Sequence, residues 1–177
     1  MDFKTIDSLF ERAHGRPLLE HEVYMLLKAA GIGTPAFHFL PAGENVRETE
    51  LEEFNGSRVV LKVVSPQILH KSDVGGVRFT ERNCAAINRV AVEMTAAVPQ
   101  AFLRWRERSG EKGRPSPSEE QIRSDILGIL ICEVVEYPQN VFGSEILLGL
   151  RLSREFGPVV TMGLGGVEVE YLSLIHI

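Results

Sequence analysis

The stretch from residue 59 to residue 77, VVLKVVSPQILHKSDVGGV, constrains this chain more than any other part of it. Its first half places Lys62 inside a run of valine and leucine, the composition of a buried strand, and a Ser-Pro pair ends that run. A lysine in such a strand is costly to bury unless it meets an anion. Two adjacent glycines, Gly75 and Gly76, let a backbone approach a ligand closely, and successive amides there can form an anion-binding concavity. Together with His70, these residues indicate the handling of a phosphoryl group.

Apolar periodicity and turn residues predict a chain of alternating helices and strands. Pro17 suits the first position of a helix, Asn83 suits an N-cap, and Pro99 is expected to end the helix that Asn83 begins. We expect helices over 3–13, 17–30, 44–54 and 83–98, and strands over 36–40, 58–64, 76–79, 127–135, 145–150, 158–162 and 167–171. Short connections favour mostly antiparallel pairing.

The segment 104–124 is almost wholly polar and is interrupted by Gly, Pro and Ser, which is typical of a linker or a mobile insertion. The sequence therefore predicts five parts. They are an N-terminal helix (1–16), a first subdomain with the glycine loop (17–103), this linker (104–124), a partial second subdomain (125–171) and a tail (172–177).

Charge and cysteine content exclude several classes of protein. The net charge of −5 gives no general attraction to nucleic acid or to an anionic membrane, and 44% apolar residues are enough for a core, so we expect a soluble globular protein. Neither a signal peptide nor a run long enough to span a membrane is apparent. Cys84 and Cys132 show neither disulfide nor metal-type spacing and are expected to be buried thiols, so the sequence predicts a cytoplasmic protein.

Three motifs carry a resemblance to a known family. They are LLEHEVYMLLKAAGI near the start, VVLKVVSPQILHKSDVGGV in the middle and GSEILLGLRLSREFGPVVTMGLGGVEVE towards the end. With these motifs in order, the chain resembles the ATP-grasp half of the ADP-forming acyl-CoA synthetases, typified by acetate–CoA ligase and related to the succinyl-CoA synthetase β subunit. The resemblance implies an α+β chain with an incomplete ATP-grasp fold, made of two α/β subdomains with mostly antiparallel sheets.

The resemblance implies that the middle motif holds nucleotide phosphates and passes a phosphoryl group on. Lys62 matches the lysine that contacts phosphates, and Gly75, Gly76 and Val77 match the loop that closes over them. A strand lysine that extends to water and a plain hairpin turn are the structural alternatives. In the resembled family, the position of His70 is proposed to take the phosphoryl group from a phosphohistidine on the CoA-binding half and to pass it to ADP.

A neutral imidazole is a competent nucleophile near pH 7, so the relay role of His70 is chemically sound. Asp73 would orient and charge-balance the imidazole, and Lys71 would steady the transferred oxygens. A structural histidine is the alternative.

Further residues of the resembled family map to the later part of the chain. The resemblance implies that Glu133, Val134 and Val135 form a hinge between subdomains, where backbone N–H and C=O groups bind the edge of the adenine. The Glu133 side chain is a candidate acceptor for the exocyclic amine. Glu145 matches a glutamate close to the nucleotide, although a solvated strand carboxylate is the alternative. A tight turn near the phosphates is expected of three glycines: Gly163, Gly165 and Gly166.

Two departures from the resembled family concern the end of the chain. Ser153 stands where an acidic residue is common, and the last six residues, LSLIHI, do not match the family pattern and suggest a truncation. The family's Mg²⁺ ligands are expected beyond this point, which leaves Glu170 as the candidate metal ligand within the chain.

The sequence therefore predicts the ATP- or ADP-binding part of an ADP-forming acyl-CoA synthetase, an acid–thiol ligase with ATP or ADP and Mg²⁺ as cofactors. Its partner would be a CoA-binding, acyl-phosphate-forming domain or subunit. Without this half and the missing C-terminal part, the chain is expected to be inactive as an acid–thiol ligase. Two alternatives remain. One is a non-catalytic nucleotide-binding fragment, and the other is an ATP-grasp ligase that joins a carboxylate to an amine and has no need of His70.

Overall fold

The computed structural model describes residues 1–14, 16–109, 116–136 and 145–165. The chain divides into two compact units, Met1–Val134 and Val135–Ile177. The division falls later than the sequence predicted, because residues 128–133, assigned there to the second subdomain, form a strand inside the first unit.

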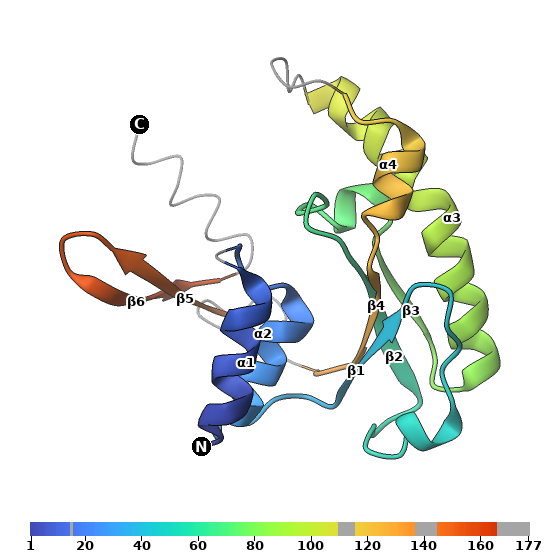
Figure 1. The fold of residues 1–177 in the computed structure, drawn as a ribbon. Coiled ribbons are helices and arrows are strands. Elements are labelled where there is room, and N and C mark those ends of the chain that lie inside the picture. Colours follow the sequence, from blue (N-terminus) through green and yellow to red (C-terminus); the bar gives the residue numbers. More distant parts are fainter. Residues whose placement is uncertain (15, 110–115, 137–144, 166–177) are drawn as a thin grey trace. The chain divides into compact units, whose positions relative to one another are not determined.

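The first unit is built on a four-stranded sheet (Figure 1). Its strands are β1 (Phe37–Pro41), β2 (Arg58–Val64), β3 (Val77–Glu81) and β4 (Gly128–Glu133), in the spatial order β1-β4-β2-β3. Every pair in this sheet is antiparallel, as the sequence predicted. The predicted bounds of β2 are confirmed at both ends.

The two faces of the sheet are covered by different helices, because successive side chains of a strand point to opposite faces. One face carries Val59, Leu61 and Val63 of β2 and packs in the main core with α3 (Cys84–Ser109). The other face is covered by α2 (Glu20–Ala29), and α1 (Phe3–Ala13) packs against α2 (Figure 1). There, a second apolar cluster contains Val60, Val64, Leu130 and Cys132, with Leu19 and Tyr24 against it.

Helix α3 is longer than the sequence predicted. Asn83 caps its start, since the Asn83 side chain accepts a hydrogen bond from the Ala86 amide at 2.8 Å, but Pro99 does not end it. A proline inside a helix removes one backbone hydrogen bond. The helix continues because its apolar face, including Val98 and Phe102, is buried against the sheet.

The prediction of a linker over 104–124 is therefore wrong at both ends of that segment. Residues 104–109 complete α3, and α4 (Glu119–Ser124) follows with Ser118 as its N-cap. Ile122 of α4 is fully buried in the main core, which explains why this polar segment is ordered against the sheet. Residues 110–115 lie outside the described residues.

Two helix predictions near the start of the chain are also corrected. Helix α2 begins at Glu20 and not at Pro17, because Leu19 is extended and the Glu22 carboxylate accepts a hydrogen bond from the Leu19 amide at 2.7 Å. Residues 44–54 form only the short 3-10 turn η1 (Glu48–Glu50). Their apolar residues Leu51 and Phe54 are buried in the core from irregular backbone.

The second unit contains an antiparallel hairpin of β5 (Ile146–Ser153) and β6 (Gly157–Leu164). Both strands were predicted, with shorter bounds. Gly163 lies within β6, paired with Leu147, so the expected glycine turn does not include it. Gly166 and the predicted strand over 167–171 lie outside the described residues.

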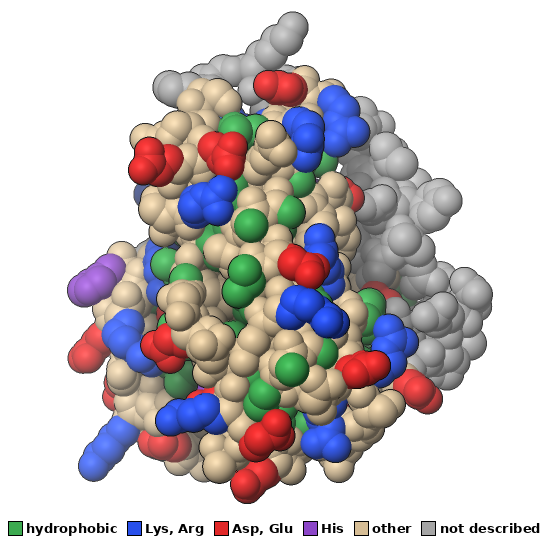
Figure 2. Space-filling view, turned by 90° about the vertical axis from the view of Figure 1, so that its right-hand side faces the viewer, with side chains coloured by type: hydrophobic (Ala, Val, Ile, Leu, Met, Phe, Trp, Pro, Cys, Tyr) green, Lys and Arg blue, Asp and Glu red, His purple; other side chains and the backbone are tan. Residues whose placement is uncertain are grey.

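Charged side chains of both signs lie on the face of the molecule that Figure 2 shows. On the face that Figure 2 shows, basic and acidic side chains alternate with polar and apolar ones, without a patch of one sign among the coloured residues. Within the described parts of the chain, no helix has the length and apolar character needed to cross a membrane.

Candidate functional site

Lys62 lies near the middle of the sheet on the face that α2 covers. Its strand neighbours across the ladder are Leu130 of β4 and Val77 of β3. The Lys62 ammonium donates a hydrogen bond to Glu20 Oε1 at 2.6 Å, and its side chain is 25% exposed. The strand therefore presents a cation on an otherwise apolar surface, as the sequence predicted, and the structure supplies its partner.

Lys71 joins the same carboxylate from a different element. It directly precedes η2 (Ser72–Val74) in the loop between β2 and β3, and its ammonium donates to Glu20 Oε2 at 2.5 Å. Glu20 is the first residue of α2, so three elements contribute one group each. The ammonium groups of Lys62 and Lys71 thus both bind the carboxylate of Glu20.

The electrostatics of this cluster follow from burial and pairing. Burial alone raises the pKa of Glu20, but the hydrogen bonds from Lys62 and Lys71 outweigh it and leave that pKa below its usual value. Burial likewise lowers the pKa of Lys62, and the bond to Glu20 outweighs this and leaves the pKa raised. Two ammonium groups share one carboxylate, so the cluster keeps one excess positive charge.

Substituting Glu20 with glutamine is expected to lower the free energy of unfolding by about 1–2 kcal/mol at neutral pH, because two partly buried lysines lose their counter-charge. The pKa of Glu20 is lowered in the folded protein, so its stabilisation is present above the ordinary carboxyl value of 4.5 and is lost as the pH falls through the lowered value. The stability gap between wild type and Glu20→Gln should therefore close in acid. Urea unfolding at a series of pH values measures it.

The matched control is Glu11→Gln on the exposed surface of α1. This variant should unfold like the wild type at neutral pH. A Glu20→Gln gap that stays constant down to the acid end of the series would contradict the ion-pair account.

The glycine pair shapes the loop that carries Lys71. Gly75 adopts φ +69°, a left-handed conformation that glycine takes without strain. A Cβ on Gly76 would lie 2.9 Å from the Lys71 carbonyl oxygen, to which the Gly76 amide donates at 2.7 Å. The Val74 amide donates to the same carbonyl and the Gly75 amide donates to Ser72. The amides of Gly75 and Gly76, which the sequence predicted to face an anion, therefore donate to carbonyl groups of their own loop in this structure.

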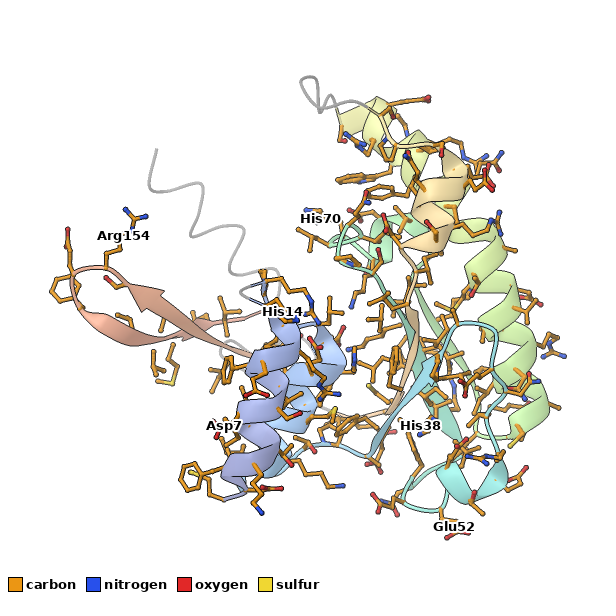
Figure 3. The ribbon with its side chains drawn as sticks, in the orientation of Figure 1. Asp7, His14, His38, Glu52, His70 and Arg154 are labelled. Atoms are coloured by element: carbon orange, nitrogen blue, oxygen red, sulfur yellow. The ribbon has the colours of Figure 1, made fainter. Side chains whose placement is uncertain are left out.

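The structure does not bring His70 or Asp73 to the lysine cluster by any contact among the described residues. The His70 side chain is exposed on the loop after β2 (Figure 3), and its ring lies against Trp105 of α3, with centroids 5.3 Å apart. Asp73 is exposed in η2 and makes neither a hydrogen bond nor an ion pair within the described part of the chain. The expected support of the imidazole by Asp73 is therefore absent from this arrangement.

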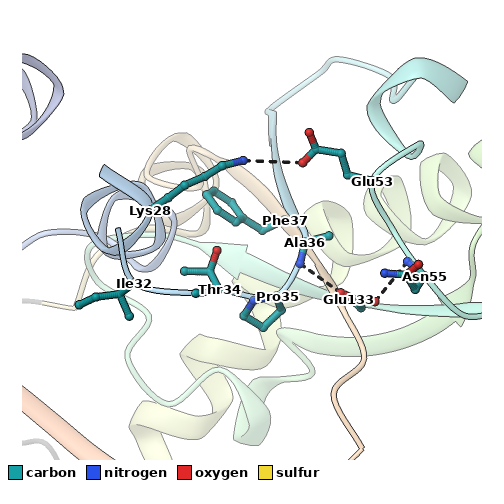
Figure 4. Close-up of a pocket in the computed structure, with 10 residues that line it drawn as sticks. Lys28, Ile32, Thr34, Pro35, Ala36, Phe37, Glu53, Asn55 and Glu133 are labelled. Carbon is teal, nitrogen blue, oxygen red and sulfur yellow. Dashed lines mark hydrogen bonds and ion pairs between the residues drawn. The ribbon is translucent and has the colours of Figure 1, made fainter. Parts of the chain in front are cut away.

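Glu133 ends β4 beside a pocket of about 370 Å³, shown in Figure 4. Its two carboxylate oxygens accept hydrogen bonds from the backbone amides of Ala36 and Asn55, each at 3.2 Å. The bond from Ala36 is the main cause of a lowered pKa of Glu133. The Glu133 amide itself donates to the Ala36 carbonyl at 2.8 Å. Both carboxylate oxygens of Glu133 are therefore engaged by main-chain amides of the first unit, and its expected role as an acceptor for an exocyclic amine stays a prediction.

The remaining predicted residues lie in the second unit or beyond the described residues. Glu145 precedes β5, and its carbonyl accepts a hydrogen bond from the Gly165 amide at 2.8 Å. Glu170 falls outside the described residues. Within the described ranges, no group of three His, Cys, Asp or Glu side chains is suited to hold a metal ion.

Two residues of this region were missed by the sequence analysis. Glu20 stands in the run EHE beside two other titratable residues, His21 and Glu22, and nothing in the pattern singled it out. Trp105 was assigned to the linker, although it is the single tryptophan of the chain and follows Phe102 at helical spacing. That spacing was the signal that could have identified it.

Comparisons with known proteins agree with the fold. The model of the ATP-grasp domain family matches residues 10–106. The chain is 33% identical to the acetate–CoA ligase (ADP-forming) I β subunit of Pyrococcus furiosus over 164 residues, which are 91% of this chain and 58% of that protein.

Two solved structures from Candidatus Korarchaeum cryptofilum are also similar. One is ACD1 in complex with coenzyme A, with 32% identity and a TM-score of 0.58 over 94% of this chain and 62% of that chain. The other is a dinucleotide-forming acetyl-coenzyme A synthetase 1 in complex with coenzyme A, Ca-AMPCP and HgCl+, with 31% identity and a TM-score of 0.55 over the same shares.

The chain thus spans about three fifths of the length of these relatives. The family match covers more than half of the chain and includes β2, the glycine loop and both lysines of the cluster. The TM-scores of 0.58 and 0.55 show that the fold is similar to that of these solved structures. This chain belongs to the ATP-grasp domain family.

Proposed function

We propose that this chain is the ATP- and ADP-binding part of an ADP-forming acyl-CoA synthetase, in which Lys62 and Lys71 hold the nucleotide phosphates. The observation that carries the proposal is the convergence of these two lysines on Glu20, because it marks a place where the fold concentrates positive charge on one anionic group. Ammonium groups neutralise phosphate oxygens as point charges that follow the oxygens when they move.

Nucleotide binding requires the lysines to exchange one partner for another. The carboxylate of Glu20 carries a single charge, whereas the phosphates of ADP or ATP carry several, so the excess positive charge of the cluster favours the nucleotide. The similarity to a synthetase solved with the analogue Ca-AMPCP supports this assignment. Within the glycine loop, the Gly76 amide would have to leave the Lys71 carbonyl before it could contact a phosphate.

His70 would act as the phosphoryl relay. In the direction of ATP use, one imidazole nitrogen attacks the γ-phosphorus of ATP and the bond from that phosphorus to the β,γ-bridging oxygen breaks. ADP leaves with the electron pair, and the second ring nitrogen releases its proton to water. The exposure of His70 on a loop next to Lys71 supports this role, since a relay residue must meet both the nucleotide and a second protein site.

A partner would supply the rest of the reaction. The named relative from Pyrococcus furiosus is a β subunit, so the proposed partner is a CoA-binding, acyl-phosphate-forming domain or subunit. The chain would then exchange the phosphoryl group with that partner through His70. The hinge residues Val134 and Val135 would contact the adenine, and Glu145 and Val77 would lie beside the nucleotide.

Calorimetric titration with ADP, ATP and adenosine tests the proposal. We expect ADP and ATP to bind with a marked salt dependence, because lysines supply the affinity, and adenosine to bind much more weakly. Equal affinity for adenosine and ADP would remove the phosphate-binding role of the cluster. Failure of both nucleotides to bind at millimolar concentration would contradict the proposal.

A further inference from the structure

The surroundings of His70 contain an aromatic support that the proposed function does not require. The His70 and Trp105 rings lie with centroids 5.3 Å apart and planes inclined by 31°. Trp105 comes from the last turns of α3, beyond Pro99, so the continuation of that helix past the proline is what delivers the indole to the loop after β2.

Trp105 is itself held by the core. Its ring stacks on Phe102, with centroids 6.0 Å apart and planes at 16°, and Phe102 is only 6% exposed. The loop that carries His70 is anchored on each side by a buried residue, Ile68 before it and Val74 after it. His70 is thus an exposed residue between two anchored points, with its ring against a supported indole.

This contact suits a nucleophilic imidazole for a geometrical reason. The lone pair of an imidazole nitrogen lies in the plane of the ring, so phosphorus must be approached at the ring edge. A side chain on the face of the ring limits its rotation and leaves the edge open. The face of an indole also attracts cations, and positive charge develops on the imidazole as it attacks phosphorus.

We propose that Trp105 is a positioning residue for His70, holding the imidazole by its face so that a nitrogen edge meets the phosphoryl group. The inference rests on the proposed function, because it takes His70 as the phosphoryl acceptor. The stacking of Trp105 on Phe102, which is buried in the core, limits the movement of the indole.

The test combines a spectroscopic and a kinetic measurement on the full chain with Trp105→Leu and the conservative variant Trp105→Phe. By proton NMR, the His70 ring signals should show a ring-current shift that Trp105→Leu removes and Trp105→Phe partly restores. With γ-labelled ATP, labelling of His70 should slow about tenfold in Trp105→Leu at an unchanged half-saturating ATP concentration, and Trp105→Phe should recover most of the rate.

The outcomes separate this inference from the proposed function. Labelling of Trp105→Leu at the wild-type rate, or His70 signals that do not change in it, would overturn the positioning role while the proposed function stands. A wild-type chain that shows the ring-current shift but is never labelled would overturn the proposed function, and the positioning role with it.

Discussion

Replacing Lys62 with methionine is expected to weaken ADP and ATP binding roughly 10- to 150-fold. Methionine keeps an unbranched apolar side chain on β2 and removes only the charge, so the sheet should keep its packing. A hydrogen bond to a charged group contributes about 1.5–3 kcal/mol, and each 1.4 kcal/mol is about tenfold in affinity. Calorimetric titration of each variant with ADP measures the loss.

The matched control is Lys4→Met, the same substitution at an exposed lysine of α1. The two variants have the same net charge, so a comparison of them at the same salt concentration cancels the general electrostatic effect of removing one lysine. Equal affinities for Lys62→Met, Lys4→Met and wild type would show that the lysine of β2 does not contact the phosphates.

Substituting His70 with asparagine is expected to abolish phosphorylation of the protein by γ-labelled ATP. A phosphohistidine is labile in acid and stable in alkali, so the label should be lost on acid treatment of the wild-type protein. ADP binding should be retained in the variant, because no contact among the described residues joins His70 to the lysine cluster. The expected result is thus loss of the covalent intermediate with unchanged nucleotide affinity.

His14→Asn is the matched control for this substitution. His14 lies at the C-cap of α1 with φ +46°, a left-handed conformation that asparagine tolerates well. Figure 3 shows His14 and His70 on separate elements of the first unit. Wild-type labelling should persist in His14→Asn. A label that also persists in His70→Asn would contradict the relay, and unchanged ligase activity without any label would favour a ligase that joins a carboxylate to an amine.

Local patterns in the sequence correctly predicted one strand, one helix cap, one helix and the positions of two constrained glycines. The strand predicted from the β-branched content of Arg58–Val64, the cap predicted at Asn83 and the helix predicted from the periodicity of Phe3–Ala13 are all confirmed. Gly75 and Gly76 likewise occupy positions that demand glycine, by a left-handed backbone and by a close approach to Lys71.

Long-range packing decided what the sequence could not predict. Glu20 and Lys62 are 42 positions apart, and their pairing depends on α2 lying over one face of the sheet. Pro99 and the polar residues after it appeared to end a helix, but burial of Phe102 and Ile122 in the core outweighs the local signal. For the same reason, the ring contact between Trp105 and His70 is visible only in three dimensions.

The loop amides illustrate a different limit. Two adjacent glycines correctly indicated a close backbone approach, but the group approached in this structure is the Lys71 carbonyl and not a ligand. The glycine pair indicates that the backbone lies close to another group. It does not indicate which acceptor receives the hydrogen bonds of the glycine amides. The candidate phosphate site therefore rests on the lysine cluster, whose convergence needs no rearrangement of the sheet.

A crystal structure of this chain with bound ADP tests most directly whether Lys62 and Lys71 are the phosphate-binding cations. We expect both ammonium groups within about 2.7–3.2 Å of phosphate oxygens, with at least one of their bonds to Glu20 released. ADP bound elsewhere, with both lysines still on the Glu20 carboxylate, would contradict that assignment.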